Sequence, residues 1–134
     1  MSQTVFADSF YFLALLNDRD PAHGRAVEVS RRKGLLLVTT EFVLLELADA
    51  LCQPHQRGEV VALWNVVQND PAFRLAKGMD ELLDRGREFY GKRSDKEWSL
   101  TDCISFVVMG DGNLTEALTG DRHFEQAGFI ARLK

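Results

Sequence analysis

Short apolar runs alternate along the chain with longer stretches in which apolar residues recur at helical spacing. The two clearest runs are residues 4–7 and 35–39, and each is followed directly by a polar residue. They are too short and too apolar for exposed strands, and such runs are typical of strands buried on both faces of a sheet. Weaker runs of the same kind occupy residues 72–76, 116–119 and 129–133.

Helices are predicted between these runs. Residues 9–17 are apolar almost all round, which indicates a buried helix. Further helices are expected at 21–33, 41–52, 59–68, 80–92 and 99–109, with a short helical turn after residue 121. Asp20-Pro21 and Thr40 are start signals, Ser99-Leu-Thr-Asp102 has the form of a capping box, and Pro54 is interpreted as the exit of the helix before it.

This alternation of buried strands and helices predicts an α/β fold. Its central sheet would be mainly parallel, with four to five strands and helices on both faces. Because no linker or repeat interrupts the pattern, residues 1–134 are expected to form a single domain. In such folds ligands bind at the carboxyl ends of the strands.

Composition supports a globular domain. Of the 134 residues, 46% are hydrophobic and 27% charged, which excludes a disordered chain. The longest apolar run, residues 10–16, is far short of the roughly 20 residues that span a bilayer. The two cysteines lie in apolar helical contexts, and no basic signal segment precedes residue 8. We therefore expect a cytoplasmic protein without membrane contact, and the net charge of −4 argues against a simple basic nucleic-acid binder.

Four carboxylates are candidates for chemistry. Asp8 and Asp121 follow predicted strands, Asp102 lies in the first turn of a helix, and Glu46 lies on a largely apolar helix surface. Each has an ordinary structural explanation when taken alone. Asp8 and Asp121 can cap helices, Asp102 completes the capping box, and Glu46 can extend from a helix edge to solvent.

Taken together, the four acids favour a cation site. Carboxylates about 4 Å apart repel by roughly 4 kcal/mol per pair at an effective dielectric of 20, so such a cluster needs a cation or raised pKa values. All-oxygen ligation favours Mg²⁺ or Mn²⁺ over zinc. Ser105 lies one helical turn after Asp102 and offers a hydroxyl on the same face.

The order Asp8, Glu46, Asp102, Asp121 resembles that of the PIN-domain nucleases, and the length is similar to that of the VapC-type toxins of type II toxin–antitoxin systems. The resemblance spans the chain and is carried by four segments: Val5-Phe-Ala-Asp8-Ser9, Thr39-Thr-Glu-Phe-Val-Leu-Leu-Glu46-Leu, Trp98-Ser-Leu-Thr-Asp102-Cys and Ala117-Leu-Thr-Gly-Asp121-Arg-His-Phe-Glu-Gln-Ala-Gly128. Glu41 and Asp49 lie close enough to Glu46 to be confused with it.

The resemblance implies a PIN-like three-layer sandwich and a metal-dependent endoribonuclease. Its four acids would hold one or two Mg²⁺ ions, which Mn²⁺ could replace, with Ser105 and Thr119 flanking them. The expected products carry a 5′-phosphate and a 3′-hydroxyl. Basic residues near the acids are candidates for RNA contact, although a solvated surface role is open for each of them: Lys92, Arg93, Lys96, Arg122 and His123.

The resemblance also implies partners. A VapB-like antitoxin would cover the site, and the toxin would form a homodimer. Transfer RNA and the sarcin–ricin loop of ribosomal RNA are the expected kinds of target, and messenger RNA stays open.

Two other enzyme classes are disfavoured. A receiver domain needs a neighbouring acidic pair and a late lysine, and a haloacid-dehalogenase-like phosphatase needs Asp-x-Asp where this chain has Phe10. The remaining alternative is a catalytically inactive PIN-like module that binds RNA or protein.

Overall fold

Strands and helices alternate throughout residues 3–134, the part of the chain that the computed structural model describes. The strands are β1 (Gln3–Ala7), β2 (Leu35–Thr39), β3 (Phe73–Leu75), β4 (Glu116–Leu118) and β5 (Ile130–Ala131). The helices are α1 (Ser9–Leu16), α2 (His23–Ser30), α3 (Glu41–Ala50), α4 (Pro54–Asn69), α5 (Met79–Lys92), α6 (Leu100–Asp111) and α7 (Arg122–Gln126). Every predicted strand is present, within two residues at each end.

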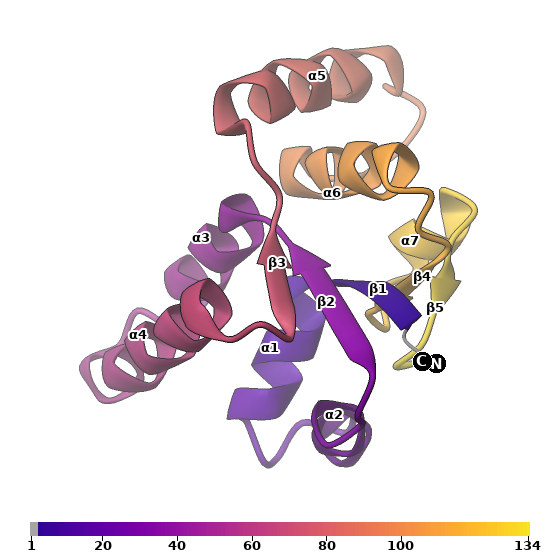
Figure 1. Cartoon of the computed structure of the whole chain (residues 1–134). Helices are drawn as coiled ribbons and strands as arrows, with labels where there is room; N and C mark the ends of the chain where they lie inside the picture. Colours follow the sequence, from indigo (N-terminus) through magenta and orange to yellow (C-terminus); the bar gives the residue numbers. More distant parts are fainter. Residues whose placement is uncertain (1–2) are drawn as a thin grey trace.

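The strands form one sheet in the order β3-β2-β1-β4-β5, and each neighbouring pair is parallel. Helices flank the sheet (Figure 1). The expected α/β architecture with a parallel sheet of four to five strands is therefore confirmed. Val5, Phe6 and Ala7 of the central strand β1 are fully buried, as a strand covered on both faces must be.

The strand order reverses beside β1. The chain builds β1, β2 and β3 in one direction and then crosses back to place β4 on the other side of β1, where Phe6 pairs with Ala117. A parallel sheet opens a crevice at the carboxyl ends of the strands that flank such a switch. Those ends are followed by Asp8 and by the segment Thr119-Gly120-Asp121.

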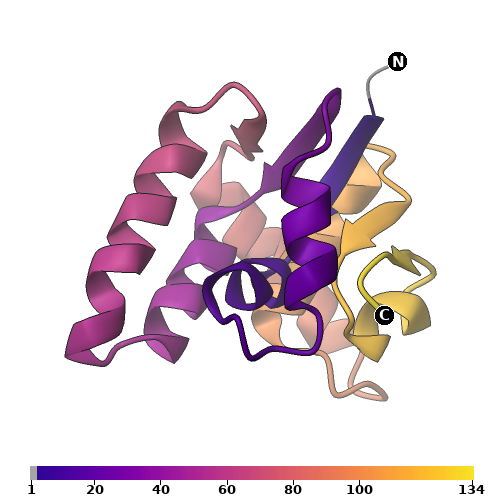
Figure 2. The ribbon, with the colours of Figure 1, turned by 90° about the horizontal axis from the view of Figure 1, so that it is seen from below.

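Two helices lie together above the carboxyl ends of β2 and β3. They are α5 and α6, which pack against each other along their length (Figure 1). Seen from below, α2 is in the foreground and α3 and α4 lie at one side of the sheet (Figure 2). The packing of α5 on α6 is tight at Gly86, where a Cβ atom would overlap the side chain of Ile104.

Two helix starts differ from their predictions. Pro54 does not end α3 but occupies the first turn of α4, where its fixed φ and missing N–H are tolerated. The Gln53 N–H donates to the Gln56 side chain, which caps this helix start. The Asp20 carboxylate accepts from the Ala22 N–H in a turn, and α2 begins only at His23. Pro21 therefore lies before α2 and not in its first turn, and Pro54 lies in the first turn of α4 and not at the end of α3.

None of the helices within residues 3–134 is both long and apolar enough to cross a membrane.

Candidate active site

Asp8 is the most deeply buried of the four candidate acids. It follows β1 directly and is 4% exposed. It occupies the N-cap position of α1 without making a side-chain capping bond. Instead its carboxylate accepts a hydrogen bond of 2.9 Å from the Thr119 hydroxyl, which follows β4. This hydrogen bond therefore joins the end of β1 to the end of β4 at the strand switch.

Glu46 approaches Asp8 from α3. Its carboxylate accepts a hydrogen bond of 2.5 Å from the hydroxyl of Ser9, the residue next to Asp8. Of the three acids that could be confused on α3, Glu46 is the one whose charge acts on Asp8, whereas Asp49 is exposed. The geometry therefore favours Glu46 as the helix acid. Ser9 was not singled out from the sequence, although it lies within the Val5–Ser9 segment.

Asp102 enters from the start of α6, where it performs the capping role that the sequence indicates. Its carboxylate accepts from the Ser99 N–H at 3.2 Å, and its own N–H donates to the Ser99 hydroxyl at 3.0 Å. The side chain is nevertheless 10% exposed and lies close enough to Asp8 for the two charges to interact. Asp102 can therefore cap its helix and lie beside Asp8 at the same time.

Asp121 completes the group from the turn after β4. It caps α7 by accepting from the His123 N–H at 2.9 Å, and its own N–H donates to the Thr119 hydroxyl at 3.1 Å. Thr119 therefore orients two acids at once, because its hydroxyl donates to Asp8 and accepts from Asp121. A threonine that is fully buried between two carboxylate-bearing segments is a positioning residue for both.

His123 lies between two of the acids. Its Nδ1 is 3.1 Å from Asp102 Oδ2 and 3.5 Å from Asp121 Oδ1. Ligand atoms of these three residues all lie within 4.8 Å of one another, which is a spacing that one metal ion could bridge. The sequence suggested phosphate contact for this histidine. In the structure its ring nitrogen bonds to Asp102, and α7 brings it there because it follows Asp121 by two residues.

Burial and mutual repulsion change the protonation of the central acids. Loss of hydration, together with the smaller effect of the neighbouring charges of Asp102 and Glu46, raises the pKa of Asp8 to about 7, against the lowering effect of the Thr119 hydrogen bond. Burial likewise raises the pKa of Asp102, with Asp121 adding to the effect, while hydrogen bonds from Ser99 and His123 oppose it. Both shifts mean that negative charge at this site is costly without a counter-ion.

A divalent cation fits this donor set. The four acids supply carboxylate oxygens from β1, α3, α6 and β4, and Asp8 is buried with no cationic side chain among the causes of its pKa shift. Hard ions such as Mg²⁺ and Mn²⁺ prefer these ligands. A bound ion would replace the missing counter-charge. The residues whose ligand atoms lie close enough to hold one ion are Asp102, Asp121 and His123, and Asp8 and Glu46 stay predicted ligands beside this group.

Ser105 is fully buried, and its hydroxyl donates at 3.0 Å to the carbonyl of Thr101 in its own helix. This bond uses the hydroxyl hydrogen and leaves the oxygen as an acceptor. A supporting role for Ser105 beside the acids stays a prediction.

The predicted basic residues lie on the surface after α5. Arg93 and Lys96 both pair with Asp95, and Arg122 pairs with Glu97 at 3.8 Å. Arg93 and Lys96 also stack over the Trp98 ring, with charged atoms 4.8 and 5.9 Å from its centre. These contacts are with Asp95, Glu97 and Trp98, and contact of the three basic residues with RNA stays a prediction.

Comparison with known proteins agrees with this arrangement. The PIN-domain family model matches residues 5–130, which include all four acids. The chain belongs to the PIN-domain family. The PIN-like fold and the family assignment made from the sequence are thereby confirmed.

Individual PIN-domain proteins are similar over almost their whole length. The "23S rRNA-specific endonuclease VapC20" of Mycobacterium tuberculosis is 27% identical over 129 residues, covering 94% of this chain and 95% of the relative. The crystal structure of VapC20, described as a sarcin–ricin loop cleaving toxin, superposes with a TM-score of 0.83 at 26% identity, covering 94% of this chain and 96% of that one.

A more distant solved structure shares the PIN fold. VapBC2 from Rickettsia felis, bound to a DNA fragment from its promoter, has a TM-score of 0.66 at 10% identity, covering 96% of this chain and 97% of that chain. At this identity the likeness concerns the fold alone.

Proposed function

We propose that this PIN domain is a divalent-metal-dependent endoribonuclease that acts as the toxin of a toxin–antitoxin pair in the cytoplasm. Residues 1–134 would form the single nuclease domain. The observation that carries the proposal is the mutual charge repulsion of the acids near the strand switch: Asp102 and Glu46 act on Asp8, whose pKa burial and these neighbours raise to about 7, and Asp121 acts on Asp102. A binding module without catalysis has no use for so costly a concentration of carboxylates.

Mg²⁺, or Mn²⁺ in its place, would supply an activated water, a clamp on the phosphate oxygens and stabilisation of the leaving oxygen. The protein's own contribution is to hold the ligands in place beforehand. Thr119 orients Asp8 and Asp121, Ser9 orients Glu46, and the capping box orients Asp102. Because these supports come from buried or half-buried backbone and hydroxyl groups, ligand binding needs little rearrangement. The expected products carry a 5′-phosphate and a 3′-hydroxyl.

We propose large-subunit ribosomal RNA as the substrate, with the sarcin–ricin loop as the region to test first. Support comes from VapC20, which is named as a 23S rRNA endonuclease and is similar over 94% of this chain. Transfer RNA is the second target to include. A VapB-like antitoxin and a toxin homodimer are the proposed partners. They are suggested by the VapC-like relatives.

The test is cleavage of total RNA and of purified large-subunit ribosomal RNA by the antitoxin-free protein, with Mg²⁺, Mn²⁺ or EDTA and with mapping of the new 5′ ends. Glu46→Gln and Asp102→Asn should lose cleavage by at least a hundredfold. Asp49→Asn is the matched control, because it neutralises an exposed acid on the same helix as Glu46. It should cut as the wild type does.

Two results would contradict the proposal. One is a folded wild-type protein that cuts no RNA with either metal, which would favour the inactive binding module. The other is cleavage that survives EDTA or the Glu46→Gln substitution, because it would come from other residues or from a contaminant.

A further inference from the structure

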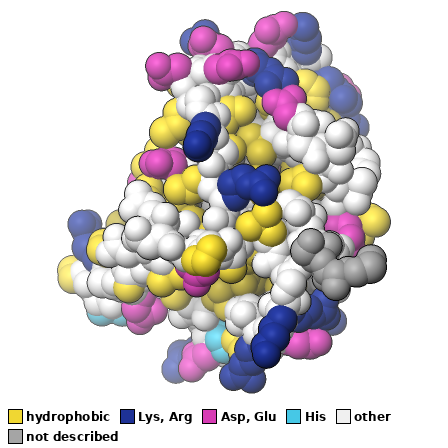
Figure 3. Space-filling model, viewed as in Figure 1, with side chains coloured by type: hydrophobic (Ala, Val, Ile, Leu, Met, Phe, Trp, Pro, Cys, Tyr) yellow, Lys and Arg dark blue, Asp and Glu magenta, His cyan; other side chains and the backbone are white. Residues whose placement is uncertain are grey.

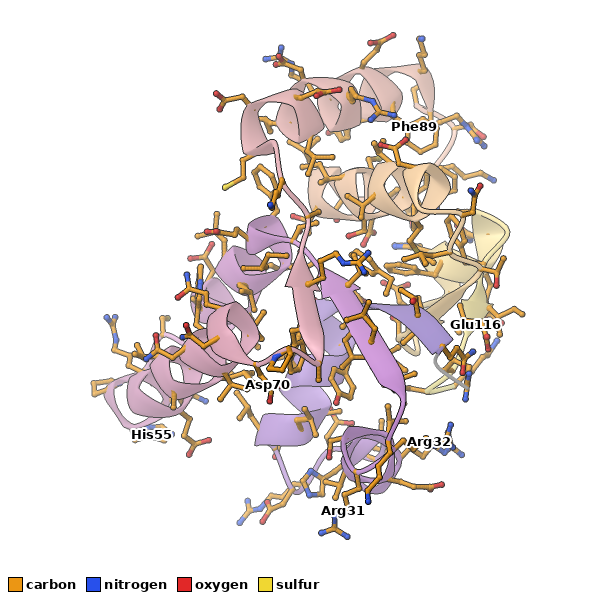
Figure 4. The ribbon with its side chains drawn as sticks, viewed as in Figure 1. Arg31, Arg32, His55, Asp70, Phe89 and Glu116 are labelled. Atoms are coloured by element: carbon orange, nitrogen blue, oxygen red, sulfur yellow. The ribbon has the colours of Figure 1, made fainter. Side chains whose placement is uncertain are left out.

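A cavity of about 490 Å³ lies between α5, α6 and the segment from α7 to β5. Its walls are largely aromatic and come from Phe89, Trp98, Phe106 and Phe129. Phe89 lies on the part of α5 that is next to α6 (Figure 4). Neither the acids nor their supporting hydroxyls line this cavity, so the proposed cleavage chemistry does not account for it.

The cavity lies one helical turn from the acids along two separate helices. On α6, Phe106 follows Asp102 by four residues, so the two share a helix face. On α7, Gln126 lines the cavity and follows His123, which contacts Asp102, by three residues. One helical turn is about 5.4 Å long. The cavity therefore begins about one helical turn from the acids, close enough for a group attached to a phosphate that is held there.

Of the four aromatic rings at the cavity, those of Phe89 and Phe129 are half-buried, while Trp98 and Phe106 are each 5% exposed. Trp98 packs edge-on against Phe106 at 5.0 Å between ring centres, and Phe89 and Phe129 add tilted rings. The indole N–H of Trp98 donates to the side-chain oxygen of Gln126 at 3.0 Å. Since indole can only donate, this bond directs the Gln126 amide oxygen to Trp98 and leaves the amide N–H₂ as a donor at the cavity.

Charged side chains line the mouth of the cavity. They include one more cation than anion, and each of the three cations pairs with a carboxylate. Over α5, acidic and basic side chains are mixed (Figure 3), and several pair with each other. Beside Trp98, however, the single carboxylate of Asp95 is shared by Arg93 and Lys96. That end of the cavity retains positive charge next to an aromatic ring.

We propose that this cavity binds one unstacked nucleobase of the RNA, with the adjoining phosphate beside Arg93 and Lys96. The proposal rests on the proposed ribonuclease function and adds a subsite to it. Proteins that recognise single-stranded RNA stack splayed bases on aromatic rings and track the backbone with cations. An apolar side chain of a protein partner would fill aromatic walls equally well, but it would leave the Gln126 amide donor and the positive charge beside Trp98 unused.

Tryptophan fluorescence can report directly on occupancy. The chain has two tryptophans, Trp64 on α4 and Trp98 in the cavity, so Trp64→Phe leaves Trp98 as the sole reporter. A single-stranded oligoribonucleotide of mixed sequence is titrated in EDTA to prevent metal-dependent cutting, beside the same backbone without bases. The intact oligonucleotide should quench Trp98, and the abasic one should not.

A second variant pair tests whether the cavity itself is responsible. Gly110 lines the cavity, and open space surrounds the position of its missing Cβ. Gly58 has the same open surroundings on α4, away from the cavity. Gly110→Phe, made in the Trp64→Phe background, should weaken binding of the intact oligonucleotide about tenfold, within the range of one lost stacked base. Gly58→Phe should leave the affinity unchanged.

The outcomes separate this subsite from the function on which it rests. Equal quenching by intact and abasic strands, or equal affinity of the two phenylalanine variants, would overturn the base pocket, even if the protein cuts RNA normally. If an antitoxin peptide changes the fluorescence of Trp98 and the oligoribonucleotide does not, the base pocket is also overturned. Base-dependent quenching by a protein that never cuts RNA would support the pocket and contradict the nuclease.

Discussion

Thr119 donates its hydroxyl hydrogen to the buried carboxylate of Asp8 over 2.9 Å, although 111 positions separate the two residues in the chain. The same oxygen accepts from the Asp121 N–H at 3.1 Å. One hydroxyl thus joins the first and last acids of the candidate site across the two central strands. Several measurable consequences depend on this contact and on the charge that it helps to stabilise.

Replacing Asp8 should stabilise the metal-free protein in a pH-dependent way. Because the folded pKa of Asp8 is raised from 3.8 to about 7, the folded state binds this proton more tightly than the unfolded state does. Stability is therefore lost as the pH rises from about 4 to 7. Asp8→Asn removes that loss, so its advantage over wild type should grow across this range, to at most about 4 kcal/mol at pH 8.

Denaturant unfolding in EDTA at pH 5 and pH 8 measures this difference. An advantage that is equal at both pH values would show that Asp8 titrates normally in the folded protein. Asp49→Asn serves as the control, because an exposed acid should give almost no change at either pH.

Metal binding should stabilise the wild-type protein and not the Asp8→Asn variant. Mg²⁺ or Mn²⁺ supplies the counter-charge that the four acids lack, and a ligand at a hundred times its dissociation constant adds about 2.7 kcal/mol. The melting temperature should therefore rise by several degrees with metal, and the rise should be abolished in Asp8→Asn. Differential scanning fluorimetry with and without EDTA provides the measurement. An unchanged wild-type melting temperature at millimolar metal would contradict the cation site.

Removing the Thr119 hydroxyl should affect both acids that it supports. Thr119→Val keeps the shape but leaves Asp8 without its hydrogen bond, so the pKa of Asp8 should rise above about 7 and the protein should lose about 1–3 kcal/mol of stability. Thr119→Ser retains the hydroxyl and should preserve the pKa. The pH dependence of metal-free unfolding distinguishes the two variants. Identical profiles would mean that the hydroxyl has no part in orienting Asp8.

The close packing of α5 on α6 gives a prediction about stability alone. A Cβ at Gly86 would overlap Ile104 Cγ1 and lie 3.3 Å from Ile104 Cα, so Gly86→Ala should cost about 1–3 kcal/mol. Gly91 lies on the same helix with nothing within 4 Å of an added Cβ, and Gly91→Ala should be neutral or gain up to about 1 kcal/mol. Urea unfolding of both variants checks the contrast, which equal stabilities would refute.

Hydrophobic periodicity predicts the fold well because the central strands β1 and β2 are apolar on both faces over most of their length. Residues 35–39 could be assigned without knowing any contact, and β2 occupies those same positions. Helix starts were less predictable. Pro54 is compatible with the end of one helix and the start of the next, and the choice depends on the Gln53–Gln56 cap, which is only visible in three dimensions.

The candidate acids can be chosen from the sequence, whereas the hydrogen bonds that support them cannot. A carboxylate that directly follows a buried strand can be placed in the site from the sequence, because ligands bind at the carboxyl ends of parallel strands. The hydrogen-bond partner of a hydroxyl cannot be inferred in this way, because Ser105 bonds to its own helix while Ser9 bonds to Glu46 on another helix. The aromatic cavity was also missed, since its walls come from α5, α6, the segment before α6 and the segment after α7.

The reversal of strand order has a consequence for when the site comes into being. β4 is made after β1, β2 and β3, yet it must dock beside β1 before Thr119 can reach Asp8. Contacts between such distant parts of a chain form slowly, because a large loop must close first. A nascent chain that stops short of residue 116 would lack the strand that carries the last acid to the first. Such a fragment would have three of the four acids and no complete site.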